Sequence, residues 1–522
     1  MNVVARKELD QLKRDQNQKS MNRILLLLTF SVCFASFWSC DRDQDFITDG
    51  SVAVRFSLDT LTFDTVFTEI GSATRFLKIY NDGDRPIKIG KVYLENGDAS
   101  KFRINVDGIS GREVEDVTIY ANDSIYVFAE VTVDPDQPLS VSPFVISENL
   151  FFETNDRQQK VVLDAWGQNA NYFPSRFNGG QAVRLTCDLG ELDFSDPKPY
   201  VFYGVVFIDS CTVNIPAGTQ IYVHGGIARN EVLGGVFNDG IIITQRSGRI
   251  RSRGTLENPV VFQGDRLEQN FQELDGQWTG VVVGVGSTGN IFEHTTIKNS
   301  IFGVYADSAA NVRLNYVNVH NTTSSGIIGI HSTINAQNVL VYNNGGNSVQ
   351  LIHGGDYNFD YTTLASYGVD ASALGMSNFI CYDDPLTCQN FNAYRLNARF
   401  RNSIIYGSKT DQLILADISG GQTEGFFNVD ISNTVVGVDD LLTDFDGLYA
   451  DFFEGICTNC VKAERQDPLF VNPSEDDYQL DSLSVAEGIA LPIRFPLPIN
   501  IDLEGKQRDP NNPDAGALER GN

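Results

Sequence analysis

The chain has 522 residues, of which 42% are hydrophobic and 20% are charged, a globular composition long enough for two or three domains. A net charge of −28 repels polyanions, so we expect no nucleic-acid partner. The 46 glycines predict a fold with many turns.

The N-terminal region predicts an exported protein. Residues 1–20 are polar and add nothing that export needs, so we expect translation to start at Met21. Arg23 is followed by an apolar run from Ile24 to Trp38, which is too short for a spanning helix and fits a signal peptide. We therefore predict a signal peptide at residues 21–39.

The Ser39–Cys40 junction resembles the lipobox of bacterial lipoproteins, in which the cysteine is acylated and becomes the first residue of the mature protein. Phe37 and Trp38 depart from that pattern, so an ordinary signal peptide or an uncleaved anchor remains an alternative. The resemblance implies attachment to a membrane through a lipid on Cys40, with residues 40–50 as the linker that follows the anchor.

The location within the envelope is indicated by the residues after the anchor. Three acidic residues there resemble the signal that sends some lipoproteins to the cell surface: Asp41, Asp43 and Asp45. We expect a lipid-anchored protein of the outer membrane that lies on the cell surface, or otherwise on the periplasmic face.

Cysteine usage agrees with export. Beyond Cys40, six cysteines remain in three local pairs, and an oxidising compartment would let each pair form a disulfide. The candidates are Cys187 with Cys211, Cys381 with Cys388, and Cys457 with Cys460. The last pair is also a CxxC motif, which can be a redox pair or half of a zinc site, but the sequence holds no second CxxC to complete such a site.

Residues 51–168 predict a small antiparallel β-sandwich. Runs such as RFLKIYN (75–81) and IKIGKVYL (87–94) alternate apolar and polar residues, and turn-forming clusters separate them. The order of features resembles the immunoglobulin-like domains of the ASPM-SPD2-Hydin type, with equivalents at Leu61 to Phe67, Leu77 to Asn81, Val127 to Pro135 and Thr154 to Gly167. The resemblance implies a spacer or adhesive unit, and we favour the spacer.

The middle of the chain repeats at intervals of 22 residues, as Ile297, Val319 and Val341 show, and we assign residues 169–480 to the repeating domain. Repeats of this length cannot bury their own apolar side chains and must stack into a solenoid. The repeats are rich in Val, Ile and Asn rather than regularly spaced Leu, which favours a parallel β-helix over a leucine-rich repeat. A second column keeps the same step, and we interpret it as a structural ladder of stacked carboxamides, with a polar site as the alternative: Asn299, Asn321 and Asn343.

The two ends of this region resemble right-handed β-helix repeat proteins of the pectin-lyase-like kind. Near the start the matching residues are Ala217, Gly218, Thr219, Gly248, Ile250, Gly254, Thr255, Pro259, Phe262, Trp278 and Gly280. Near the end they are Asp467, Pro468, Phe470, Tyr478, Leu480, Asp502, Gly505, Arg508, Asp514, Gly516, Ala517 and Glu519. We therefore predict an all-β protein, a right-handed parallel β-helix preceded by a small antiparallel β-sandwich, with residues 481–522 as a cap over the open end of the solenoid.

Proteins of this family often act on polysaccharides or bind them, as lyases, hydrolases or binding surfaces. A lyase needs a base, and residues that follow inward positions of a strand point outward. One such column supplies candidate catalytic residues, although a solvated polar face would look the same: Lys298, His320 and Tyr342. A hydrolase needs two close carboxylates, and we find no such pair beside this column.

A metal site has weak support in the sequence. His331 and His353 are also 22 residues apart and could stack at a turn, but no carboxylate keeps their step. The acidic composition is compatible with calcium, yet the sequence contains no Asp-x-Asp-x-Asp-Gly loop. We therefore expect no cofactor.

Two functions of different classes remain open. The first is a non-catalytic envelope protein that presents the β-helix as a binding or scaffold surface for a glycan or an envelope protein. The second is a polysaccharide lyase or glycoside hydrolase that acts on an acidic polysaccharide. We favour binding, because the sequence supplies a candidate column but no converging set of catalytic groups.

Overall fold

The computed structural model describes residues 46–48, 53–67, 72, 74–132, 144–155, 157–173, 182–230, 235–238, 240–267, 271–384, 387–444 and 447–520. Contacts divide the chain into two compact units, and the division falls within four strands, near residues 61, 129, 147 and 163. No helix in these ranges is long and apolar enough to cross a membrane. The predicted signal peptide, Cys40 and most of the predicted linker lie outside the described residues.

The described residues form an all-β protein, as predicted. Helical structure is confined to short turns in these ranges: η1 (Gly97–Ala99), η4 (Asp440–Leu442), α2 (Phe452–Gly455) and η6 (Pro473–Glu475). The strands form antiparallel sheets in the N-terminal part and one long parallel ladder in the rest.

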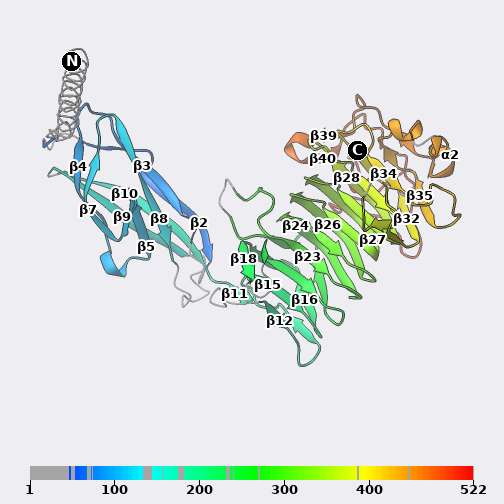
Figure 1. The fold of residues 1–522 in the computed structure, drawn as a ribbon, viewed down its shortest axis with the longest axis horizontal. Helices are drawn as coiled ribbons and strands as arrows, with labels where there is room; N and C mark the ends of the chain where they lie inside the picture. The colour runs from blue at the N-terminus through cyan, green and yellow to red at the C-terminus, as the bar shows by residue number, and fades with distance from the viewer. Residues whose placement is uncertain are drawn as a thin grey trace, which may run out of the picture. The chain divides into compact units, whose positions relative to one another are not determined.

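Two five-stranded antiparallel sheets make up the N-terminal β-sandwich (Figure 1). The first has, in spatial order, β1 (Arg55–Phe56), β3 (Arg75–Asn81), β8 (Asp123–Val131), β5 (Phe102–Val106) and β6 (Ile109–Gly111). The second has β2 (Thr60–Phe67), β10 (Arg157–Gln168), β9 (Phe144–Thr154), β4 (Ile87–Leu94) and β7 (Glu113–Ile119). Alternate residues such as Leu77, Ile79 and Val92 are fully buried, which is the pattern of a sheet with one face in a core.

The parallel β-helix follows, and its strands pair in parallel with strands of the next coil on three faces (Figure 1). The first face contains β12 (Val183–Leu185), β15 (Val205–Ile208), β20 (Ile241–Thr244), β23 (Gly280–Val283), β25 (Val304–Ala306), the first parts of β27 (Ile327–Asn344) and β28 (Val349–Ser366), β29 (Leu374–Ser377) and β34 (Leu413–Ala416). Each strand of this face pairs with the equivalent strand of the next coil, so the repeating unit is one coil, as the 22-residue period predicts.

The other two faces continue through the same coils. The second face contains β13 (Glu191–Asp193), β16 (Thr212–Pro216), β21 (Arg249–Arg253), the first halves of β24 (Asn290–Ser300) and β26 (Asn311–Thr322), the middle of β27 and β28, β32 (Leu396–Arg401), β35 (Phe427–Ser432) and β37 (Cys457–Thr458). The third contains β11 (Asn171–Phe173), β14 (Tyr200–Tyr203), β17 (Gln220–His224), β22 (Val260–Gly264), the last parts of β24, β26, β27 and β28, β33 (Ile404–Gly407), β36 (Val435–Val436) and β38 (Val461–Lys462).

Three antiparallel hairpins stand beside the ladder: β18 (Ile227–Asn230) with β19 (Gly235–Asn238), β30 (Phe379–Cys381) with β31 (Phe391–Ala393), and β39 (Phe470–Asn472) with β40 (Asp477–Leu480). The predicted inward residues Ile297, Val319 and Val341 are fully buried in the solenoid core. A glycine is required beside two of them, because a Cβ on Gly303 would lie 2.3 Å from Val319 Cγ1 and one on Gly326 would lie 2.5 Å from Val341 Cγ1.

The chain turns between the second and third faces at one left-handed residue per coil. We call this column, which runs from β24 to β38, the tail corner; its residues have φ between 41° and 55° and are His294, Tyr316, Asn338, Tyr361, Asn402, Asn433 and Asn459. A positive φ outside glycine is uncommon, and Asn tolerates it best. The corner therefore explains why Asn recurs at coil positions that a strand would not favour.

The predicted Asn ladder lies at a second corner of the same kind, and it differs from the prediction. Asn299, Asn321 and Asn343 have φ of 62°, 54° and 50°. Among these three, one carboxamide rung is present, from Asn343 Nδ2 to Asn321 Oδ1 at 3.4 Å. Asn299 instead donates to the carbonyls of Gln272 and Leu274, so the backbone conformation rather than a continuous ladder accounts for the column.

The tail, residues 481–520, lies along the flank of the solenoid. Several outward residues of the third face are apolar, and Leu340, Ile404 and Val435 pack in one cluster with Ala515 and Ala517 of the tail. We predicted a cap over the open end, whereas these contacts cover a side face of several coils. The physical reason is that this apolar face would otherwise be in water.

Hydrogen bonds fix the tail along the tail corner, coil by coil. Asn433 Nδ2 donates to Ile489 O at 3.1 Å, and Asn402 exchanges two bonds with the backbone of Leu491, at 2.7 and 3.0 Å. Tyr361 Oη donates to Leu491 O at 3.0 Å. Asn338 Nδ2 donates to Ile501 O at 3.1 Å, so four successive coils are bonded to one segment of chain.

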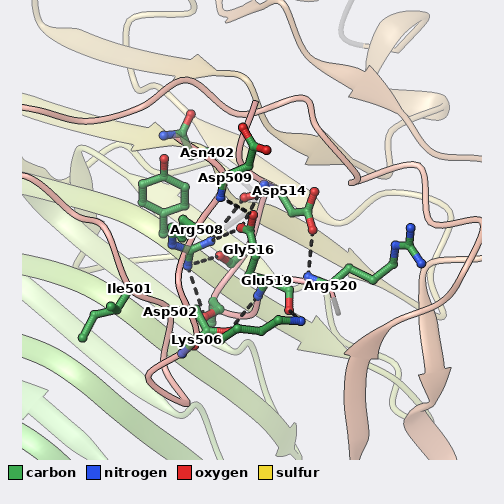
Figure 2. Close-up of polar contacts among 12 residues, drawn as sticks. Asn402, Ile501, Asp502, Lys506, Arg508, Asp509, Asp514, Gly516, Glu519 and Arg520 are labelled. Carbon is green, nitrogen blue, oxygen red and sulfur yellow. Dashed lines mark hydrogen bonds and ion pairs between the residues drawn. The ribbon is translucent and has the colours of Figure 1, made fainter. Parts of the chain in front are cut away.

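Arg508 lies at the centre of a buried polar network in the tail (Figure 2). It pairs with Glu519 at 3.2 Å, donates to Asn338 Oδ1 at 2.7 Å and to Gly516 O at 3.0 Å. Its guanidinium lies 3.9 Å from the centre of the Tyr361 ring, and burial is the main cause of its lowered pKa. The network therefore joins the tail to the tail corner through a desolvated charge pair.

The acidic residues of the C-terminal motif hold turns of the tail. Asp502 accepts backbone N–H bonds from Glu504, Lys506 and Glu519, and Asp514 accepts them from Gly488 and Arg520. Asp502 and Asp514, which we matched by resemblance, therefore have a structural role in this chain: they hold turns of the tail through backbone N–H bonds.

We predict that Arg508→Met strongly destabilises the β-helix unit, because it leaves the Glu519 carboxylate buried without its partner. Loss of one partner of a buried pair costs about 3–5 kcal/mol of unfolding free energy. Thermal unfolding followed by circular dichroism measures the effect. The control is Arg55→Met, which removes an even shorter pair with Asp82, at 2.7 Å, that is exposed to solvent, and should leave the melting temperature almost unchanged. Equal shifts in the two variants would contradict a structural role for the network.

Candidate functional site

The predicted column Lys298, His320 and Tyr342 points outward from the third face in successive register. The His320 and Tyr342 rings stack with their centres 4.7 Å apart and their planes 4° apart. The inward neighbours are in the solenoid core, so the alternation that we used to assign the direction of these side chains is correct.

The column is covered rather than open. Lys298 Nζ pairs with Glu273 at 3.0 Å, and the ring of Tyr342 packs against that of Tyr478 at 4.8 Å. His320 is 8% exposed. Burial, followed by the charge of Lys298, lowers the pKa of His320 to about 4, and burial raises the pKa of Tyr342. Neither ring is therefore tuned as a base for neutral pH.

A cavity of about 330 Å³, which we call the tail pocket, lies beside this column. The solenoid contributes the His294 and Tyr316 rings, whose centres are 4.5 Å apart in a stacked pair, together with His320. The β39–β40 hairpin and the tail contribute Tyr478 and Glu504. The pocket thus brings together two of the three predicted column residues, and Lys298 is not among its lining residues.

The predicted histidine pair lies at the third corner of the coil, where His331 and His353 have φ of 45° and 66°. Their ring centres are 5.9 Å apart, and the Tyr394 ring lies 3.9 Å from one and 4.6 Å from the other. In the part of the chain that the structure describes, no group of three or more His, Cys, Asp or Glu residues is placed to hold a metal ion.

The six cysteines form three disulfides in the structure: Cys187–Cys211, Cys381–Cys388 and Cys457–Cys460. The first links adjacent coils, and the second closes the loop of the β30–β31 hairpin. The CxxC pair stands at the last coils of the ladder, where β37 and β38 end it. These bonds stabilise local turns of the fold.

The second face carries a row of planar polar side chains that the sequence analysis missed. Asp356, Asn397 and Asn428 are in register on three coils and are joined by carboxamide bonds, both of 2.8 Å. Four residues further along the same strands, Asp360 accepts two bonds from Arg401, at 2.7 and 2.9 Å. The side chains are therefore held in fixed positions on the surface of the sheet.

A groove of about 640 Å³, which we call the ladder groove, follows this row. Its polar lining is Asp356, Asn358, Asn397, Arg399, Asn428 and Asp430. The sequence signal was lost because successive rungs are 41 and then 31 residues apart: the β30–β31 hairpin lengthens the first interval, and the turns between β34 and β35 lengthen the second. Only the strand register, which the structure supplies, shows that these groove residues are neighbours.

No protein-family model and no curated protein matches the chain. Among solved structures, an ASH/PapD-like domain of human CEP192 is 13% identical, with a match that covers 23% of this chain and 87% of that domain at a TM-score of 0.16. The catalytic unit of a GH87 α-1,3-glucanase from Streptomyces thermodiastaticus is 10% identical, with 69% and 73% covered at a TM-score of 0.20. A family 123 glycoside hydrolase from Clostridium perfringens is 7% identical, with 37% and 44% covered at a TM-score of 0.17. These TM-scores are too low to support an argument about fold or function.

We predict that His320 makes stability depend on pH below neutrality. Its pKa falls from 6.5 to about 4 on folding, so the unfolded chain binds a proton that the folded chain does not. The neutral His320 ring makes its full contribution to the free energy of unfolding above pH 6.5, and this contribution is lost as the pH falls toward 4. The total change is on the order of 3 kcal/mol. His320→Phe should flatten the fall in melting temperature between these values; parallel curves for the two proteins would contradict the buried, neutral ring.

Proposed function

We propose that this chain binds a polysaccharide along the ladder groove and holds it without cleaving it. The observation that carries the proposal is the groove itself, where planar polar side chains from three successive coils line one continuous surface. The covered state of the Lys298–Tyr342 column supports a binding function over catalysis at that column, since Lys298 is paired with Glu273 and the Tyr342 ring packs against Tyr478.

The chemistry of the groove suits sugar hydroxyls. Carboxylates, carboxamides and guanidinium groups each present two polar atoms in one plane, which can bond adjacent hydroxyls as donors or acceptors. Coils repeat about every 4.8 Å, close to the length of one sugar unit, so that successive coils can contact successive units of a chain. Bonds such as that from Asn397 to Asp356 already fix the side chains, which reduces the entropy lost on binding.

We further propose that the protein is a lipoprotein of the outer membrane. The support is the signal-like segment 21–39 and the lipobox-like Ser39–Cys40 junction. In this proposal the β-sandwich is an immunoglobulin-like spacer between the lipid and the binding face. The partners are then the membrane, through the lipid on Cys40, and a polysaccharide of the envelope or its surroundings.

Glycoside hydrolysis is a second candidate, with one observation in its favour. Asp356 and Asp430 line the same groove, and hydrolysis needs two carboxyl groups that flank the scissile bond. Asp356, however, accepts a bond from Asn397, which suits a carboxylate that positions a ligand. The experiment below separates the two functions because it follows binding and products in the same samples.

We predict that the detergent-solubilised full chain binds one or more members of a panel of neutral and acidic polysaccharides, and that Arg399→Ala weakens this binding at least about tenfold, since a charged hydrogen bond is lost. Affinity electrophoresis measures the binding. The matched control is Arg465→Ala, which removes an exposed arginine outside the groove and should keep the affinity.

The same samples are assayed for new reducing ends and for unsaturated uronates. We expect neither. New reducing ends that Asp430→Asn abolishes would replace the binding proposal with hydrolysis, and unsaturated products would replace it with β-elimination. A panel that yields neither binding nor products would remove the polysaccharide from the proposal.

We predict that Cys40→Ser moves the protein from the membrane fraction to the soluble fraction of the envelope, because the acyl chains supply the attachment. Metabolic labelling with a radioactive fatty acid and cell fractionation measure the effect. The control is Cys33→Ser, which alters a cysteine within the predicted signal peptide and should keep both the label and the membrane location. A labelled or membrane-bound Cys40→Ser protein would contradict the anchor.

A further inference from the structure

The tail pocket contains polar atoms whose hydrogen-bonding capacity is unused. Three residues that line it each have a buried side-chain atom with no hydrogen-bond partner among the described residues: Asn318 Oδ1, His320 Nδ1 and Tyr478 Oη. His320 and Tyr478 are 8% and 3% exposed. Buried polar groups are nearly always paired, so three unpaired atoms around one cavity indicate a place where a further molecule supplies the partners.

The charge of the pocket restricts what that molecule can be. Its described lining includes three carboxylates, of Asp476, Asp477 and Glu504, and neither Lys nor Arg. An anionic ligand such as a uronate or a phosphate would be repelled there. The remaining polar lining consists of hydroxyls, amides and imidazoles, which bond neutral hydroxyls and amines.

The shape of the pocket also fits a small ring. About 330 Å³ lies at the lower end of the range for small-molecule sites. The stacked rings of His294 and Tyr316 form part of the wall and offer it an apolar surface. Both belong to the tail corner, on the two coils before Asn338, which is bonded to the tail through Ile501.

We infer that the tail pocket binds a single uncharged or amine-bearing sugar unit, whose hydroxyls pair with Asn318, His320 and Tyr478. This goes beyond the proposed function, because the pocket lies at the third face and the tail, whereas the ladder groove lies on the second face. The pocket therefore gives the protein a second, monosaccharide-sized site beside a surface for a polymer.

Isothermal titration of the full chain with methyl glycosides of glucose, galactose and mannose, and with their 2-amino forms, tests the inference. We expect at least one of these to bind and the methyl glycoside of glucuronate not to bind. Failure of every neutral and amino glycoside would overturn the inference, and so would preferential binding of glucuronate, because the carboxylates would then not set the selectivity.

Tyr478→Phe is the decisive variant. It removes a hydroxyl that has no protein partner, so the melting temperature should stay the same or rise, while the affinity for the sugar falls at least about tenfold. The matched control is Tyr449→Phe, which removes the hydroxyl that donates to Leu415 O at 3.2 Å away from the pocket. That variant should lose thermal stability and keep sugar binding.

Two further outcomes separate this site from the ladder groove. If Arg399→Ala rather than Tyr478→Phe abolishes monosaccharide binding, the sugar lies in the ladder groove and the inference fails. If Tyr478→Phe keeps full affinity for the sugar, the Tyr478 hydroxyl is not one of its partners and the inference fails. Polysaccharide binding that survives Tyr478→Phe leaves the proposed function intact in either case.

Discussion

The architecture of the β-helix from β24 onward depends on one backbone constraint, a single residue in the left-handed conformation between the second and third faces of each coil. Because a single residue makes the turn, strands such as β26 and β27 pass from one face to the next without a loop. The corner side chain then stands at the edge between two faces, within reach of any segment that lies there. The tail forms hydrogen bonds with side chains at these edge positions. The tail pocket lies along the same edge, on the coils before Asn338.

Much of the fold could be predicted from the sequence, because the physics that sets it is local and periodic. Alternation placed Ile297, Val319 and Val341 inside and their neighbours outside, and the 22-residue step identified the coils. The Asn column was located correctly but explained by side-chain stacking, whereas the left-handed backbone at Asn299, Asn321 and Asn343 is its main cause.

The candidate sites were less predictable, because they depend on contacts between distant parts of the chain. Arg508 bonds Asn338 from 170 positions away, and Ala517 bonds Thr363 from 154 positions away. Alternation shows that His320 points outward but cannot show that the tail and the β39–β40 hairpin cover that face. The ladder groove was hidden for a different reason, since an inserted hairpin changes the spacing of its rungs.

The tail also changes how the solenoid can unfold. A repeat array normally loses coils from an end one at a time, because each coil contacts only its neighbours. Here the tail forms hydrogen bonds with one residue on each of four successive coils: Asn338, Tyr361, Asn402 and Asn433. These coils therefore cannot unfold one at a time without breaking hydrogen bonds to the tail. The C-terminal half of the β-helix thus acquires the cooperativity of a globular domain, while the coils before Asn338 retain the gradual behaviour of a repeat protein.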